Sequence, residues 1–123
     1  MRGVALWFVS LGTVFLLVGM VWGIQMSASQ DHTLSPAHGH LNLIGFVLFC
    51  LFGLYYHVVE EAAEAKVAKL HFALSVVTVI VMVPGIVSAI NQTGETMAKL
   101  GSVLGLVTGL LFLYVVVSSR QKA

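Results

Sequence analysis

Four stretches of this chain are apolar for about 20 residues each, and that length constrains the fold more than any other feature of the sequence. The stretches cover residues 4–24, 37–58, 70–90 and 100–118 and leave only short segments between them. A helix of about 20 residues crosses the ~30 Å hydrocarbon core of a bilayer, where its backbone groups must pair within the helix itself. We therefore predict an all-α protein, a single membrane domain over residues 1–123 with four transmembrane helices.

The charged residues indicate how these helices are oriented and which partners are excluded. Charged side chains make up 9% of the chain and the formal net charge is +1, so no basic surface for nucleic acid is expected. Lys99 lies at one set of helix ends, and the other set carries Arg2, Lys66, Lys69, Arg120 and Lys122. Because cytoplasmic loops carry an excess of Lys and Arg, we predict a multi-pass cell membrane protein with both termini and the 60–69 segment in the cytoplasm.

Two histidines, His38 and His40, open the second apolar stretch on the side predicted to be outside. An ionisable side chain at the edge of the hydrocarbon is costly to place there, so a functional site is the default expectation. Imidazole is a common ligand for iron, copper and zinc. We therefore predict a metal centre, and a haem in particular, near the outer, periplasmic-side face of the membrane.

Helical geometry separates these two histidines. Residues two apart on a helix point about 200° apart, so His38 and His40 cannot bind one iron from the same helix. The face of His38 is predicted to continue through Asn42, Gly45, Phe49, Phe52 and Tyr56, and that of His40 through Ile44, Val47, Leu51, Leu54 and Val58. The two histidines can serve two different centres, or one centre can lie between helices of different protomers. This geometry predicts a homo-oligomer in the lipid bilayer.

The other histidines are weaker candidates. His57 and His71 fall on the cytoplasmic side, and His40 and His57 are 17 residues apart, or about 25 Å of helix, so they cannot share an iron. We interpret His57 as an interfacial anchor and His71 as the start of a small-residue packing face, and we leave their roles as ligands open. His32 lies in a polar loop, where a solvated side chain is expected.

Residues 40–62 resemble the second helix of the nitric oxide reductase catalytic subunit, which belongs to the haem-copper oxidase superfamily. In that family the helix opens with histidine, any residue, asparagine and leucine, as His40-Leu-Asn42-Leu does here. It closes with a glycine and a tyrosine pair before an acidic loop, as the chain does from Gly53 to Glu61. The chain also resembles short, stand-alone four-helix proteins similar to oxidase subunit I. The resemblance implies that His40 is an axial ligand of a low-spin haem.

The resemblance also implies an assembly. A full catalytic subunit has three arcs of helices related by pseudo-threefold symmetry, and this chain matches a single arc, so a homotrimer is the favoured oligomer. His38-Gly39-His40 resembles a His-x-His pair that a later helix of the family carries, with its members facing two haems. His38 of a neighbouring protomer is then the leading candidate for the second axial ligand, with Met26 and Met97 as alternatives.

We predict a noncovalent haem b, because the chain lacks the Cys-x-x-Cys-His motif that attaches haem covalently. The predicted metal ligands are His40 and His38, and the predicted cofactor-binding residues are His40, His38, Gly39, Asn42, Gly45 and Phe49. Gly39 and Gly45 are expected to let the porphyrin approach the helix backbone, and Phe49 to supply aromatic surface.

The predicted function is one-electron transfer by a b-type cytochrome, with a redox protein or quinol as its partner. Two alternatives stay open. The first is a haem or haem/copper enzyme of NO or O2 chemistry that works as a homo-oligomer, with copper as a further candidate metal. The second is a haem-free membrane protein whose histidines bind copper or zinc. The binuclear haem-copper centre of the family is not complete in a single arc of helices, so no catalytic residue is predicted.

Overall fold

The computed structural model describes residues 1–121 and has no strand over that range, so the predicted all-α class is confirmed. Four helices are long and apolar enough to cross a membrane. Three of them are α1 (Gly3–Ser29), α5 (Lys66–Ile90) and α6 (Thr96–Ser118). The second in chain order is a continuous run of α2 (Ser35–His40), the π-helical segment η1 (Leu41–Val47) and α3 (Leu48–Val58). The short helix α4 (Glu60–Glu64) joins it to α5.

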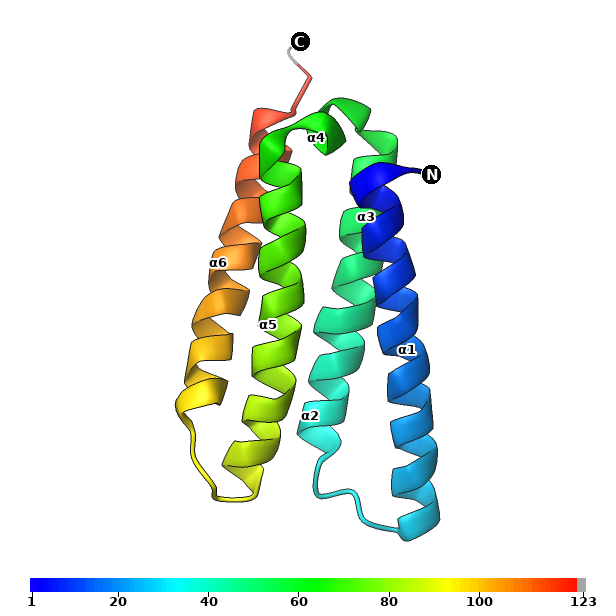
Figure 1. The fold of residues 1–123 in the computed structure, drawn as a ribbon, viewed down its shortest axis with the longest axis vertical. Coiled ribbons are helices and arrows are strands. Elements are labelled where there is room, and N and C mark those ends of the chain that lie inside the picture. The colour runs from blue at the N-terminus through cyan, green and yellow to red at the C-terminus, as the bar shows by residue number, and fades with distance from the viewer. Residues whose placement is uncertain (122–123) are drawn as a thin grey trace.

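The long helices run alternately up and down, so the two ends of the bundle differ. The start of α1, the end of α6 and the whole of α4 lie at one end, which we call the α4 end (Figure 1). The loops over 30–34 and 91–95 lie at the other end, which we call the loop end. The start of α1 and the end of α6 are therefore on the same side of the bundle, and the cytoplasmic placement of that side stays a prediction. Lys122, one of the charges on which that prediction rests, lies outside the described residues.

The helices extend beyond the predicted apolar stretches. Helix α1 ends at Ser29 rather than 24, and α5 begins at Lys66 rather than 70. Hydropathy marks only the part of a helix that lies in hydrocarbon, and polar residues continue the backbone hydrogen bonds past it. Helix α1 stops where Gln30 adopts a left-handed conformation with φ of 59°, a common helix ending.

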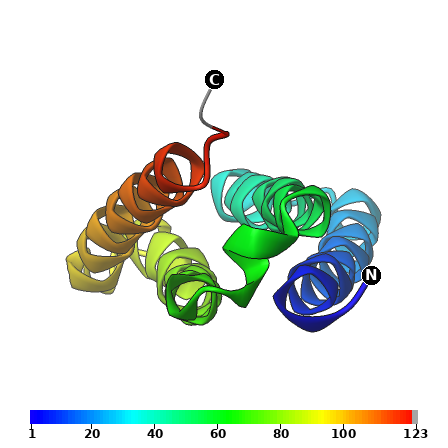
Figure 2. The ribbon, with the colours of Figure 1, turned by 90° about the horizontal axis from the view of Figure 1, so that it is seen from above.

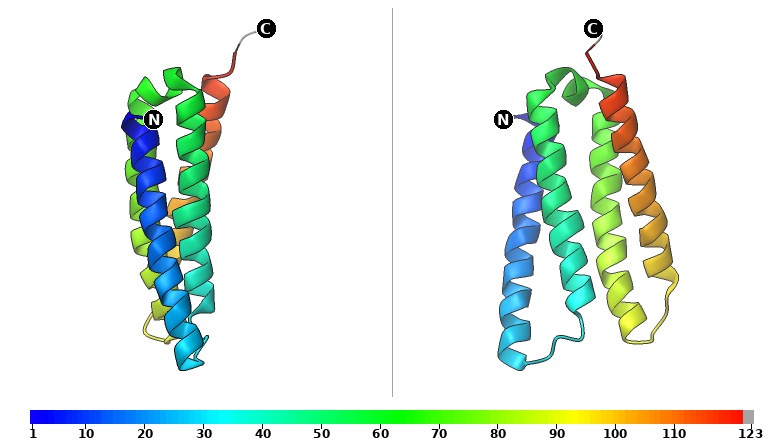
Figure 3. Two further views of the ribbon diagram at one scale, coloured as in Figure 1. Left: turned by 90° about the vertical axis from the view of Figure 1, so that its right-hand side faces the viewer. Right: turned by 180° about the vertical axis from the view of Figure 1, so that it is seen from behind.

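The bundle consists of two closely packed helix pairs, one formed by α1 with α3 and one by α5 with α6 (Figures 2 and 3). Glycines allow the close approach within each pair. A Cβ at Gly53 of α3 would lie 3.0 Å from the Ala5 carbonyl oxygen of α1. A Cβ at Gly101 of α6 would lie 2.7 Å from the Met82 Cα of α5. Substitution at either position must therefore move backbone.

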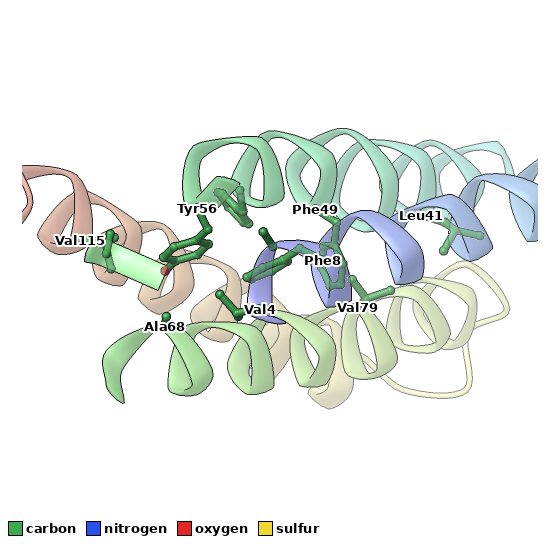
Figure 4. Close-up of a cluster of buried hydrophobic side chains, with 11 residues drawn as sticks. Val4, Phe8, Leu41, Phe49, Tyr56, Ala68, Val79 and Val115 are labelled. Carbon is green, nitrogen blue, oxygen red and sulfur yellow. The ribbon is translucent and has the colours of Figure 1, made fainter. Parts of the chain in front are cut away.

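A cluster of aromatic side chains fills the α4 half of the bundle (Figure 4). Phe8 of α1 is fully buried at its centre and packs edge-on against Phe49 and Phe52 of α3 and Phe72 of α5, with ring centroids 5.0 to 5.6 Å apart. Edge-to-face contacts of this kind stabilise by about 0.5–1.5 kcal/mol each beyond the area they bury. The cluster joins the two helix pairs at this end.

Large apolar side chains cover the outward faces of the bundle. Leu17 of α1, Leu54 of α3 and Leu106 of α6 are each more than half exposed. Such a surface would associate in water but is matched to lipid. Together with the four long apolar helices, it identifies a multi-pass membrane protein.

Candidate functional site

His40 is positioned as a single free imidazole at the loop end of the second membrane helix. Its Nδ1 lies 2.7 Å from the carbonyl oxygen of Pro36, one turn earlier in α2. A carbonyl oxygen can only accept, so Nδ1 carries the proton and donates it. Nε2 is left with a lone pair on an exposed ring. Backbone hydrogen bonds of this kind orient ligand histidines in metal sites and fix their tautomer.

His40 stands at the edge of a cleft of about 330 Å³ between the second membrane helix, α5 and α6. We call this the His40 cleft. Its lining combines aromatic and aliphatic side chains, hydroxyl groups and two glycines, contributed by His40, Ile44, Leu48, Phe49, Phe52, Ser75, Thr78, Met82, Ser102, Gly105, Thr108 and Gly109. At Gly109 a Cβ would meet nothing within 4 Å, so this part of the wall is flat and open.

The π-helical segment η1 directly follows His40 and decides which residues share its cleft. A π turn contains about one residue more than an α turn, so every later side chain is rotated relative to regular helical spacing. His40 and Ile44 share a face, as predicted, but Phe49 and Phe52 line the same cleft. Phe49 also packs against Phe15 of α1, as Gly45 does, so it keeps part of the face predicted for it. Single π turns occur often at functional sites.

His38 points away from the cleft and into the contact with α1. Its half-buried ring has Nε2 2.8 Å from the carbonyl oxygen of Gly19 and packs edge-on against Trp22. Nε2 must donate this bond, because the carbonyl can only accept. The two histidines thus face different sides, as their spacing predicts, and the structure does not bring the two predicted ligands together within one chain.

The other predicted cofactor-binding residues divide between the two sides. Phe49 lines the cleft, and Gly39 is exposed beside it in sequence with open space around its Cα. Gly45 instead packs against Phe15 of α1, where an added Cβ would lie 3.0 Å from the ring. The space predicted for a porphyrin at Gly45 is therefore filled by a helix contact. Asn42 also faces α1, with its Oδ1 buried and without a partner among residues 1–121.

His71 is the most buried histidine in the described chain, with an exposed fraction of 0%. Its Nδ1 lies 2.9 Å from the hydroxyl of Tyr56, and the ring packs against Phe52 at 4.5 Å and Phe112 at 5.5 Å between centroids. Its Nε2 is buried and has no hydrogen-bond partner among residues 1–121. The small-residue face that begins at His71 is a packing face, as predicted, and the structure shows that it packs against α6. The pairing of His71 with Tyr56 gave no signal in the sequence.

The remaining candidates lie apart from the His40 cleft. His57 is exposed at the α4 end, and His32 is exposed in the loop before α2. Met26 is buried on α1, and Met97 is 42% exposed at the start of α6. Met82 of α5, which the sequence did not single out, lines the His40 cleft.

Comparisons of the chain with protein-family models, curated proteins and solved structures gave no match.

Proposed function

We propose that this chain is a membrane b-type cytochrome that holds haem b noncovalently in the His40 cleft and transfers single electrons. One observation carries the proposal: His40 lines an aromatic cleft between membrane helices, and its Nδ1 proton is committed to Pro36, which leaves the lone pair on Nε2. A haem bound there supplies an iron that cycles between two oxidation states. The chain supplies the axial imidazole, a flat wall at Gly109 and the rings of Phe49 and Phe52.

The donor set favours a porphyrin over a bare metal ion. Structural zinc sites use four protein ligands and catalytic sites usually three. Residues 1–121 of one chain contain no group of three or more His, Cys, Asp or Glu side chains placed to hold a metal. A porphyrin brings four nitrogen ligands of its own and needs only one or two from the protein. A single imidazole such as His40 suffices for it, so the haem-free copper or zinc alternative is disfavoured.

The size of the cleft supports an assembly of several chains. About 330 Å³ lies at the lower end of the range for small-molecule sites, roughly 300–1,000 Å³. A macrocycle in the cleft would leave an edge uncovered, and a second copy of the chain would cover it. We propose a homo-oligomer for this reason and retain the trimer as the favoured count.

The second axial ligand has two candidate sources. His38 of a neighbouring protomer would have to release the Gly19 carbonyl or bind through Nδ1. Met82 lies in the same cleft as His40 and offers a thioether from within the chain. The excess of Lys and Arg at the α4 end places that end in the cytoplasm of the proposed arrangement, with His40 near the outer face of the cell membrane.

The test is haem retention in the purified protein. Wild-type protein in detergent should carry haem b that acidified organic solvent extracts intact, and His40→Ala should lose most of it. The matched control is His57→Ala, which removes an exposed histidine at the α4 end and should keep full occupancy. Full occupancy and an unchanged reduced-minus-oxidised spectrum in His40→Ala would overturn the assignment.

Assembly is tested separately by native mass spectrometry in detergent. We expect several chains to retain haem together. A dimer would keep the shared site and refute the threefold arrangement. A haem-replete monomer would refute the intersubunit site and favour Met82 as the second ligand.

A second function is favoured by the hydrogen bond of His38 to Gly19. If that bond persists and Met82 does not bind, iron held by His40 alone has an open position for a small gas such as NO or O2. Carbon monoxide distinguishes the two functions, because it alters the spectrum of five-coordinate iron and leaves a six-coordinate low-spin haem unchanged.

A further inference from the structure

The pair formed by His71 and Tyr56 has no role in the proposed haem site. Both side chains are almost fully buried, with exposed fractions of 0% and 1%, and they come from different membrane helices. Their only polar contact with each other is the 2.9 Å bond between Tyr56 Oη and His71 Nδ1. An ionisable group inside a membrane domain is costly and is by default a functional candidate.

Tyr56 connects this pair to the α4 end of the bundle. It lines a second cleft, of about 390 Å³, which we call the vestibule. The titratable and charged groups of the vestibule are the Met1 amine, Arg2, His57, Glu60 and Glu64. Glu60 and Glu64 are therefore the carboxyl groups that line the same cleft as Tyr56.

On its other sides, three apolar rings pack around His71. Phe8 of α1, Phe52 of α3 and Phe112 of α6 enclose the imidazole, and none of them titrates. Nε2 has no partner among residues 1–121, so no carboxylate holds the ring charged and no donor holds it neutral. The one partner is a hydroxyl, which can donate to neutral Nδ1 and accept from protonated Nδ1. Such a partner suits both protonation states.

We propose that His71 is a buried proton-accepting site, filled from the vestibule through the hydroxyl of Tyr56. In the step, a hydronium ion or a protonated carboxyl group of Glu60 or Glu64 in the vestibule gives a proton to Tyr56 Oη and is left as water or a carboxylate, while the phenolic proton passes to His71 Nδ1. Tyr56 ends as it began, and the imidazole becomes an imidazolium with a proton on each nitrogen. Release follows the same path in reverse, so no ring rotation is needed in the packed core.

His71 lies next to the His40 cleft, which gives a proton bound to it a function. Phe52, which contacts the ring, and Ser75, one helical turn along α5, both line the His40 cleft. An electron that arrives in that cleft adds a negative charge in a medium of low dielectric. The positive charge of an imidazolium at the inner end of the cleft offsets that negative charge. This coupling rests on the proposed haem, whereas the proton path itself does not.

The first experiment measures the path without haem. Protein with 15N-labelled histidine rings, in detergent, reports by NMR the rate at which His71 exchanges between imidazole and imidazolium, from the relaxation dispersion of its Nδ1 signal. We expect Tyr56→Phe to slow this exchange at least tenfold. Tyr55→Phe is the matched control, since the Tyr55 hydroxyl bonds Ser119 instead, and it should leave the rate unchanged. Equal rates in wild type and Tyr56→Phe would refute the path.

The second experiment tests the coupling in haem-loaded protein. The midpoint potential should fall as pH rises in wild type and in Tyr56→Phe, because the phenylalanine slows proton transfer without removing the acceptor. His71→Phe should lose that part of the pH dependence. An identical pH dependence in His71→Phe refutes the coupling, and the exchange result still decides the path. Protein that binds no haem but shows the Tyr56-dependent exchange would refute the cytochrome and keep the proton site.

Discussion

Gly101 offers a sharp test of how the wall of the His40 cleft is held. A Cβ at Gly101 of α6 would lie 2.7 Å from Met82 Cα and 2.8 Å from Met82 Cβ on α5. Main-chain atoms cannot rotate out of the way, so Gly101→Ala must push the two helices apart. Overpacking of this kind costs about 1–3 kcal/mol. The gain in helix propensity from glycine to alanine, about 1 kcal/mol, offsets part of that cost.

Gly109 provides the matched control on the same helix. Its Cβ would meet nothing within 4 Å, so Gly109→Ala keeps the gain in propensity without the clash. The gain cancels between the two variants, and we expect Gly101→Ala to unfold at a free energy about 1–3 kcal/mol below Gly109→Ala.

The measurement is reversible unfolding by SDS in mixed micelles, followed by circular dichroism. Equal midpoints for Gly101→Ala and Gly109→Ala would refute the contact between Gly101 and Met82 as described. A lower midpoint for Gly109→Ala would refute the open cleft wall.

Three further predictions concern the cleft, the α5–α6 contact and the loop end. Gly109→Leu should fill the cleft and lower the ratio of haem to protein, measured by absorbance, while the helix content stays unchanged. Thr78→Val should lower the SDS midpoint by about 1 kcal/mol, since it removes the 3.2 Å hydroxyl bond to Thr108 with little change of volume. The hydroxyl and backbone N–H of Thr33 donate to the Asp31 carboxylate and hold its pKa below the ordinary value. The contact therefore stabilises the folded loop at pH values above the pKa of Asp31 in the unfolded chain. This stabilisation is lost as the pH falls through the lower pKa of the folded protein. Thr33→Val should move the pKa of Asp31 upward in an NMR titration, and an unmoved pKa would contradict the bond.

The helices could be predicted because a single physical length decides them. The thickness of hydrocarbon requires about 20 apolar residues, and all four stretches supply them. The ends could not be predicted equally well, because helix α1 continues through Ser27 to Ser29 outside the apolar stretch. The short helix α4 could not be predicted either, because nothing in its charged sequence, Glu60–Glu64, marks it as a helix.

The candidate site could be predicted only in part. The divergence of His38 and His40 follows from two residues of regular helix, so spacing alone predicts it. The position of Phe52 required knowledge of η1, and a π turn has no reliable signature in a sequence. The walls from α5 and α6 depend on how separate helices pack, which a periodicity within one helix does not contain. The bond of Tyr56 to His71 is of the same kind, since it spans 15 residues across α4.

The histidines of this chain differ in which ring nitrogen is hydrogen-bonded and in the group to which it is bonded. His40 and His38 each use one nitrogen on a backbone carbonyl, which fixes the tautomer of each ring. Of the two, only His40 lines the open cleft. His71 uses one nitrogen on a hydroxyl, which fixes nothing, and its other nitrogen lies in an apolar core. A ring with a fixed tautomer and an open lone pair is suited to bind a metal, because the lone pair is already directed. A ring whose only partner accepts both states is suited to exchange a proton. The same side chain therefore supports the proposed electron site at one end of the cleft and the proposed proton site at the other.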